Sequence, residues 1–152
     1  MSQRLNYPKL APAGAQALGA VYGYLQKSGL DPALIDLVFL RISQINGCAF
    51  CIDMHSHDLL NRPGVPTEKA LLLPAWREAG SLYTEEERAA LQWAEAVTRI
   101  DATGAPDANY EAAKVCFDDK GLVDLTIGIA LINAYNRLAI SFRMRPMHLP
   151  AQ

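Results

Sequence analysis

Apolar residues recur along most of the chain with the spacing of amphipathic α-helices. Leu18, Val21, Tyr22 and Leu25 occupy positions i, i+3, i+4 and i+7, and they predict a helix that ends near Ser28. No segment combines apolar–polar alternation with turn residues at its ends, as a half-buried strand would. The pattern therefore predicts an all-α protein.

The segment after this first helix predicts a buried helix at the centre of the fold. Asp31 is a helix cap and Pro32 follows it at the first helical position, so the helix begins there and runs to the break at Asn46–Gly47. Its apolar side chains point to nearly all sides, which predicts burial all round. These side chains are Leu34, Ile35, Leu37, Val38, Phe39, Leu40, Ile42 and Ile45. A further helix should follow the break and continue to about Asn61, with Pro63 ending it.

The second half of the chain carries clear start signals for helices. Thr67 is expected to cap a short helix that continues to Leu73, before Pro74 interrupts it. Thr84–Glu87 has the sequence of a capping box and predicts a helix that reaches about Arg99.

Two more helices are expected to complete the fold. One begins at Pro106 and ends near Phe117, and the last is capped by Asp118 or Asp119 and stopped by Pro146. An apolar stripe on the last helix consists of Leu122, Leu125, Ile129, Ile132 and Ala139. The chain is thus predicted to form a single compact domain, 1–152 with its core at about 22–145, of about six to eight helices.

Composition and charge narrow the function classes. The 152 residues are enough for one domain with a real core, and 51% of them are hydrophobic while 20% are charged. A net charge of −2 gives no reason to expect a nucleic acid or an anionic membrane as partner. The first residues lack the apolar core of a signal peptide, and no run approaches the roughly 20 apolar residues of a membrane span. A cytoplasmic location is therefore expected.

Candidate chemistry is concentrated between Cys48 and His55. Cys48 and Cys51 lie three residues apart and His55 follows four residues later, so a helix would present all three on one face. Two thiols at this spacing can form a disulfide, and a nearby imidazole can move a proton for them. The neighbouring His55 favours Cys51 as the attacking thiol. The free N–H groups of the helix N-terminus favour a thiolate at Cys48, so the choice stays open.

Zinc binding is the alternative use of the same residues. Cys48, Cys51 and His55 could bind zinc tetrahedrally, with His57 or Cys116 as the fourth ligand. Structural zinc sites usually take ligand pairs from two separate segments, however, and the chain has no second pair. A Cys-x-x-Cys pair in a reducing compartment also favours redox chemistry over a permanent disulfide.

Other conspicuous side chains are interpreted as structural. Packing is the expected role of Cys116, Trp76 and Trp93, and His57 should face solvent. A polar cluster inside the last helix is interpreted as an interface or helix-capping network rather than as part of the site. Its members are Asn133, Asn136 and Arg137.

The run SQINGCAFCIDMH, from Ser43 to His55, resembles the AhpD-like branch of the carboxymuconolactone decarboxylase family, and the resemblance extends to 73–77, 83–88 and 133–137. It implies an all-α protein that assembles as a homotrimer or homohexamer. It also implies a thiol-dependent alkylhydroperoxidase in which Cys48 and Cys51 cycle between dithiol and disulfide. The implied partners are a hydroperoxide substrate and a dithiol or dithiol-protein reductant, and no bound cofactor is required. The decarboxylase branch lacks the cysteine pair, so lactone decarboxylation is not expected.

The chain departs from the pattern of these enzymes at two positions. Their relay glutamate is replaced by the shorter Asp36, so the resemblance implies Asp36 as the relay or orienting carboxylate of His55. Their histidine before the second cysteine is replaced by Phe50, which cannot relay protons and makes the site more apolar. A thiol–disulfide oxidoreductase or redox sensor with low peroxidase turnover is therefore the alternative function, and a zinc-stabilised structural module is the less favoured one.

Overall fold

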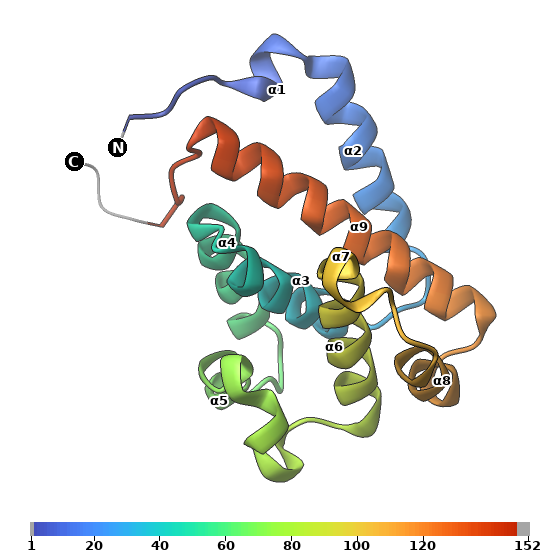
Figure 1. Ribbon diagram of the computed structural model, residues 1–152. Coiled ribbons are helices and arrows are strands. Elements are labelled where there is room, and N and C mark those ends of the chain that lie inside the picture. The colour runs from blue at the N-terminus through green and yellow to red at the C-terminus, as the bar shows by residue number, and fades with distance from the viewer. Residues whose placement is uncertain (1, 149–152) are drawn as a thin grey trace.

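The computed structural model describes residues 2–148, so residues 1 and 149–152 of the predicted domain lie outside the described part. Residues 2–148 form a single all-helical body without strands, which confirms the predicted fold class (Figure 1). The α-helices are α1 (Tyr7–Leu10), α2 (Pro12–Leu25), α3 (Pro32–Asn46), α4 (Ala49–Leu60), α5 (Thr67–Leu71), α6 (Glu85–Thr98), α7 (Ile100–Thr103), α8 (Asp107–Cys116) and α9 (Asp119–Phe142), and two 3-10 helices, η1 (Leu73–Glu78) and η2 (Gly80–Leu82), follow α5. Six of the α-helices have ten or more residues, in agreement with the expected six to eight.

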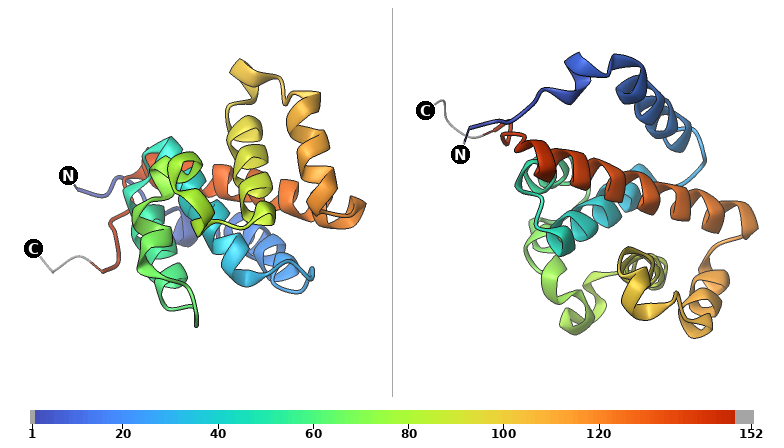
Figure 2. Two further views of the ribbon diagram at one scale, coloured as in Figure 1. Left: turned by 90° about the horizontal axis from the view of Figure 1, so that it is seen from below. Right: turned by 45° about the horizontal axis from the view of Figure 1, so that its top comes forward.

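Helix α3 is the centre of the fold, as its all-round apolar pattern predicts. It packs against α4, α6 and α9, which surround it in Figures 1 and 2. Two hydrophobic clusters meet at α3. Val38 and Ile42 belong to a cluster with α6 and α9, whereas Leu37 and Leu40 belong to a second cluster with Trp76. A helix that contributes to both needs apolar side chains on opposite faces.

Three predicted caps are formed in the structure and begin the long helices. Asp31 accepts a hydrogen bond from Ala33 N at 2.8 Å at the start of α3. Thr84 forms the complete capping box of α6, and Asp118 caps α9. Each side chain satisfies an N–H group that has no partner inside the first turn of its helix.

Helix α9 crosses the other long helices, and its predicted stripe is buried. It packs against α2, α3, α4 and α6. At Gly128 it passes close to Phe39 and Leu25, since an added Cβ would lie in van der Waals contact with them, 3.4 Å from Phe39 Cε1 and 3.5 Å from Leu25 Cδ1. By length and composition α9 is apolar enough to span a membrane, although no run of sufficient length was expected from the sequence. This is weak evidence for a span, because the core helix of a soluble protein passes the same test.

The structure corrects several predicted helix boundaries. Helix α9 ends at Phe142, where Arg143 adopts a left-handed conformation, and not at Pro146. Thr67 is the first residue of α5 rather than its cap, and Pro74 lies inside the 3-10 helix η1 instead of interrupting a helix. Helix α2 ends at Leu25, before the predicted stop.

Helix α1, near the N-terminus, was not predicted from the sequence. Asn6 caps this short helix. Arg4 N donates to Phe142 O at 3.0 Å, so the segment before α1 lies beside the end of α9. Both ends of the described chain are therefore on one side of the molecule (Figure 2).

Candidate active site

The candidate site begins at the sharp turn between α3 and α4. Gly47 has φ +70°, a left-handed conformation that glycine adopts without steric cost, and it ends α3. Cys48 follows as the N-cap of α4, and its Sγ accepts a hydrogen bond from Cys51 N at 3.3 Å. The predicted position of Cys48 at a helix N-terminus is therefore confirmed.

Cys48 and Cys51 form a buried, hydrogen-bonded thiol pair. They are 1% and 2% exposed, and both are free thiols. The hydrogen bond from the Cys51 thiol lowers the pKa of Cys48 to about 7, against the opposing effect of burial. The same bond and burial raise the pKa of Cys51 above its ordinary value. At neutral pH and above, the pair thus tends to share one proton and one negative charge, with the charge on Cys48.

A polar network lies beneath the thiol pair and joins α3 to α9. Asn136 is fully buried, and its side chain donates to Ser43 Oγ at 3.1 Å and accepts from Asn46 Nδ2 at 2.8 Å. Hydrogen bonds from Asn136 favour the thiolate form of both cysteines, and Ser43 favours that of Cys51. The polar network predicted at Asn136 is present. It supports the thiol pair, whereas the sequence favoured an interface or helix-capping role over a role in the site.

His55 lies one helical turn beyond Cys51 on the inner face of α4. It is 3% exposed, and the edge-to-face contact of its ring with Phe39 has a centroid distance of 5.2 Å. Burial lowers the pKa of His55 to about 4, so the ring is neutral at physiological pH. A neutral imidazole has a lone pair on one nitrogen and can therefore accept a proton from a thiol.

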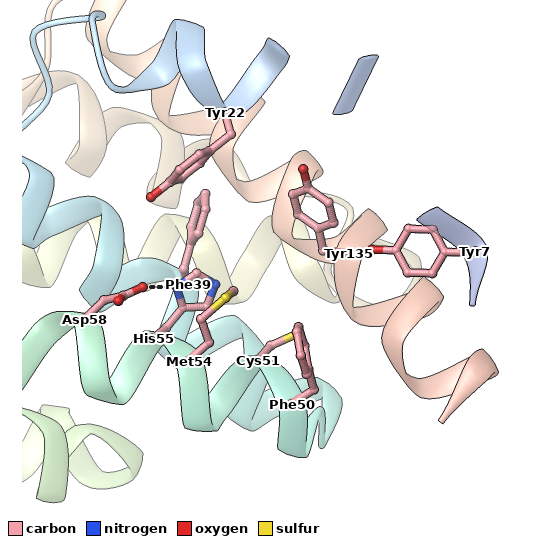
Figure 3. A pocket seen from close by; sticks show the side chains of 9 residues that line it. All are labelled: Tyr7, Tyr22, Phe39, Phe50, Cys51, Met54, His55, Asp58 and Tyr135. Carbon is pink, nitrogen blue, oxygen red and sulfur yellow. Dashed lines mark ion pairs between the residues drawn. The ribbon is translucent and has the colours of Figure 1, made fainter. Parts of the chain in front are cut away.

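Two carboxylates stand near His55. Asp36, on α3, is 1% exposed, and Arg62 Nε donates to its Oδ2 at 2.7 Å. Burial raises the pKa of Asp36 although Arg62 opposes the shift. Asp58, on α4, has Oδ2 3.8 Å from His55 Nδ1 (Figure 3). Asp36 is thus brought to the site, as the sequence suggests, and Asp58 joins it.

A pocket of about 360 Å³ opens beside the thiol pair, and Cys51 lines it (Figure 3). Cys48 is not among its lining residues, so Cys51 is the thiol on the pocket side of the pair. The wall is mainly aromatic. It comprises Tyr7, Tyr22, Phe39, Phe50, Met54, His55, Asp58 and Tyr135 besides Cys51.

The tyrosines of this wall were not predicted as site residues from the sequence. Tyr7 comes from α1 and Tyr135 from α9, so only the folded chain brings them to Cys51. Tyr135 lies in the segment 133–137 that carries the resemblance, whereas no local motif marks Tyr7. Phe50 could be placed from its position between the cysteines, and the structure confirms that it makes the site more apolar.

The structure does not assemble the zinc ligands of the alternative interpretation. Within residues 2–148, the group whose donor atoms could hold one metal ion is Asp36, His55 and Asp58, with all three atoms within 4.8 Å of one another. Arg62 already supplies positive charge to Asp36 there. His57 is exposed and stacks on His148 with ring centroids 4.1 Å apart.

The chain is similar to one protein family and to several known proteins. The Carboxymuconolactone decarboxylase family matches residues 12–96. Uncharacterized protein YdfG of Bacillus subtilis is 37% identical over 95% of this chain and 97% of its own length. A protein of unknown function from Agrobacterium tumefaciens, described as a candidate AhpD antioxidant defence protein, has 42% identity and a TM-score of 0.91 over 99% of this chain and 100% of that one. Alkyl hydroperoxide reductase AhpD of Koribacter versatilis is 37% identical over 43% of this chain and 32% of its own length.

Proposed function

The chain belongs to the carboxymuconolactone decarboxylase family, and on that premise we propose that it is a thiol-dependent alkylhydroperoxidase of the AhpD-like branch. The observation that carries the proposal is the thiol pair at the pocket. Cys51 lines the pocket, and Cys48 lies beneath it at the helix N-terminus with a pKa of about 7. Such a pair holds one thiolate and one thiol at neutral pH, so the sulfur that is not oxidised by the peroxide can resolve the one that is.

The proposed reaction is a two-electron reduction of a hydroperoxide. The Cys51 sulfur attacks one peroxide oxygen and the O–O bond breaks, which gives a sulfenic acid and an alcohol. The thiol of Cys48 then attacks the oxidised sulfur, and water leaves as the Cys48–Cys51 disulfide forms. His55 receives the Cys51 proton and returns it to the leaving alkoxide. A dithiol or dithiol protein reduces the disulfide and completes the cycle.

The pocket favours an organic hydroperoxide over hydrogen peroxide. Its wall is aromatic, and burial of apolar substrate surface there supplies binding energy that hydrogen peroxide cannot use. This aromatic wall beside Cys51 supports peroxidase activity with an organic hydroperoxide over the alternative of a thiol–disulfide oxidoreductase or redox sensor. Cytoplasmic location belongs to the proposal, because a reducing compartment would regenerate the dithiol.

Mass spectrometry of the reduced protein tests this proposal. One equivalent of cumene hydroperoxide is expected to remove about 2 Da and to link Cys48 to Cys51, while Cys116 remains a free thiol. Hydrogen peroxide is expected to react about tenfold more slowly, because it gains nothing from the apolar wall. Unmodified Cys48 and Cys51 at millimolar peroxide would exclude peroxidase activity. Rapid exchange with small disulfides in that case would favour the oxidoreductase alternative.

Assembly as a homotrimer or homohexamer is also proposed, with α2 in the interface. This helix has no charged residue, and Leu25 is its one buried side chain. An uncharged, exposed helix is unusual for a surface in contact with water.

Light scattering is expected to give three or six times the chain mass of 16.6 kDa. Ala17→Lys, on the exposed part of α2, should lower the measured mass, because it would bury a charge. Val115→Lys is the control, since Val115 is 86% exposed on α8. A mass near that of one chain for the unmodified protein at micromolar concentration would contradict the assembly.

A further inference from the structure

One ring nitrogen of His55 lacks a hydrogen-bond partner among the described residues. Nδ1 is buried and has no hydrogen-bond partner within residues 2–148. Buried polar atoms are nearly always paired, so an exception at a candidate active site requires an explanation. Nδ1 does form an ion-pairing contact with Asp58, whose Oδ2 lies 3.8 Å away (Figure 3). A small rotation of the Asp58 side chain would close this gap to a hydrogen bond.

Asp36 is less suited to serve Nδ1, although the resemblance assigns it the relay. Arg62 Nε holds its carboxylate at 2.7 Å, so the charge of Asp36 is already compensated. Asp58 makes no other ion pair within the described residues, and its side chain is 42% exposed against 1% for Asp36. Asp58 is therefore free to move and keeps its charge at low cost in desolvation.

We propose that Asp58 is the positioning residue of His55, and the proposal rests on the proposed peroxidase function. Its carboxylate holds the proton on Nδ1, which leaves the lone pair on Nε2. Figure 3 shows the second ring nitrogen on the side of His55 away from Asp58. A carboxylate that fixes an imidazole tautomer and stabilises the imidazolium is a general device of acid–base catalysis.

This arrangement gives a balanced proton path. As the Cys51 sulfur attacks the hydroperoxide, its proton moves to Nε2 of His55, and the ring becomes an imidazolium between Asp58 and the pocket. The sulfur is oxidised to a sulfenic acid while the O–O bond is reduced and broken. The alkoxide then takes the proton from Nε2, and His55 returns to the neutral tautomer. Asp58 keeps its charge throughout and compensates the positive ring, which burial alone disfavours.

The experiment uses Asp58→Asn, which removes the charge and keeps the shape, and Asp58→Glu, which keeps the charge. Asp53→Asn is the matched control, because Asp53 is on the same helix but contacts His148 instead of His55. The rate of Cys51 oxidation by cumene hydroperoxide in one turnover is expected to fall on the order of tenfold in Asp58→Asn. Asp58→Glu should recover most of the loss, and Asp53→Asn should lose little.

A second readout does not depend on peroxidase activity. The chain has 3 histidines, so nitrogen NMR of labelled histidine can follow each ring, with His55→Gln to identify the signal of His55. The expected signal is the tautomer protonated on Nδ1, and it should shift towards the Nε2 tautomer in Asp58→Asn alone. The other ionisable groups that face His55 are Asp36, Cys51 and Tyr22, and they are unchanged in every variant compared.

The two readouts separate the possible failures. A wild-type ring protonated on Nε2, or an unchanged tautomer in Asp58→Asn, would overturn the assignment even if the peroxidase is active. An equal loss of rate in Asp58→Asn and Asp53→Asn would also overturn it. Absence of peroxide reaction together with the expected tautomer shift would overturn the proposed function, while Asp58 would remain the residue that positions His55.

Discussion

Replacement of Cys51 by serine is expected to lower turnover with cumene hydroperoxide by at least about a thousandfold, because the variant has no thiol at the pocket. Cys48→Ser should fail differently. Its Cys51 would still meet the peroxide, form a sulfenic acid once and stop, because no partner thiol remains to resolve it. The two variants should thus be equally inactive in steady state and clearly different in a single turnover. Trapping of the sulfenic acid with dimedone measures this difference.

Acidity and access to the pocket favour different cysteines as the thiol that attacks the peroxide. Cys48 is the more acidic thiol, with a pKa of about 7, whereas Cys51 is the thiol that lines the pocket. We expect access to decide, because the peroxide oxygen must come into contact with the sulfur, whereas the Cys51 thiolate can form by transfer of its proton to His55. Cys48 does not line the pocket, so a peroxide bound there meets the Cys51 sulfur first.

Cys116→Ser is the control for the loss of a thiol. Cys116 is a half-buried residue at the end of α8, outside the thiol pair and the pocket. Its variant should keep full turnover. A trapped sulfenic acid in Cys51→Ser, and none in Cys48→Ser, would reverse the assigned roles and make Cys48 the attacking thiol.

The sequence predicts this fold well where the signals are local. Asp31, Thr84 and Asp118 each cap the helix that they precede, because a cap acts within one turn of its own position. The break at Gly47 is local too, and it was enough to place Cys48 at a helix N-terminus. The C-terminal ends of helices were harder to predict from the sequence. Arg143 ends α9 in a left-handed conformation that arginine seldom adopts, and nothing in its sequence neighbours marks it.

The surroundings of the site could not be predicted, because they come from distant segments. Asn136 meets Ser43 across 93 residues of sequence, so its place beneath the thiols depends on how α9 packs on α3. Tyr7 reaches the pocket from a helix too short to leave a periodic pattern. Asp58 lies on α4, the same helix as Cys51 and His55. Its proximity to His55 points to a role only because Arg62 forms an ion pair with Asp36. Pairings of this kind are properties of the tertiary structure.

The largest expected effect on stability concerns Glu95, which is 8% exposed on α6. Its carboxylate accepts hydrogen bonds from Arg41 Nε at 2.7 Å, Trp76 Nε1 at 2.9 Å and Arg77 at 2.6 Å. Glu95→Ala would leave the largely buried guanidinium of Arg41 and the indole N–H of Trp76 without this partner. The free energy of unfolding is therefore expected to fall by about 3–5 kcal/mol. Urea denaturation at one fixed protein concentration measures the loss, since assembly would make the midpoint depend on concentration.

The same network predicts a dependence of stability on pH. Burial would raise the pKa of Glu95, but the hydrogen bonds from Trp76, Arg77 and Arg41 outweigh it and hold the pKa below its ordinary value. A carboxylate whose pKa is lower in the folded state stabilises the protein above its unfolded pKa, and this contribution disappears as the pH falls through the folded one. The difference between wild type and Glu95→Gln should therefore be largest near neutral pH and shrink in acid. Glu111→Ala, at an exposed position of α8, is the control and should change the free energy of unfolding by less than about 0.5 kcal/mol. A loss below about 1 kcal/mol in Glu95→Ala would mean that Arg41 and Trp76 find other partners, and that the carboxylate does not hold α3 and η1 to α6.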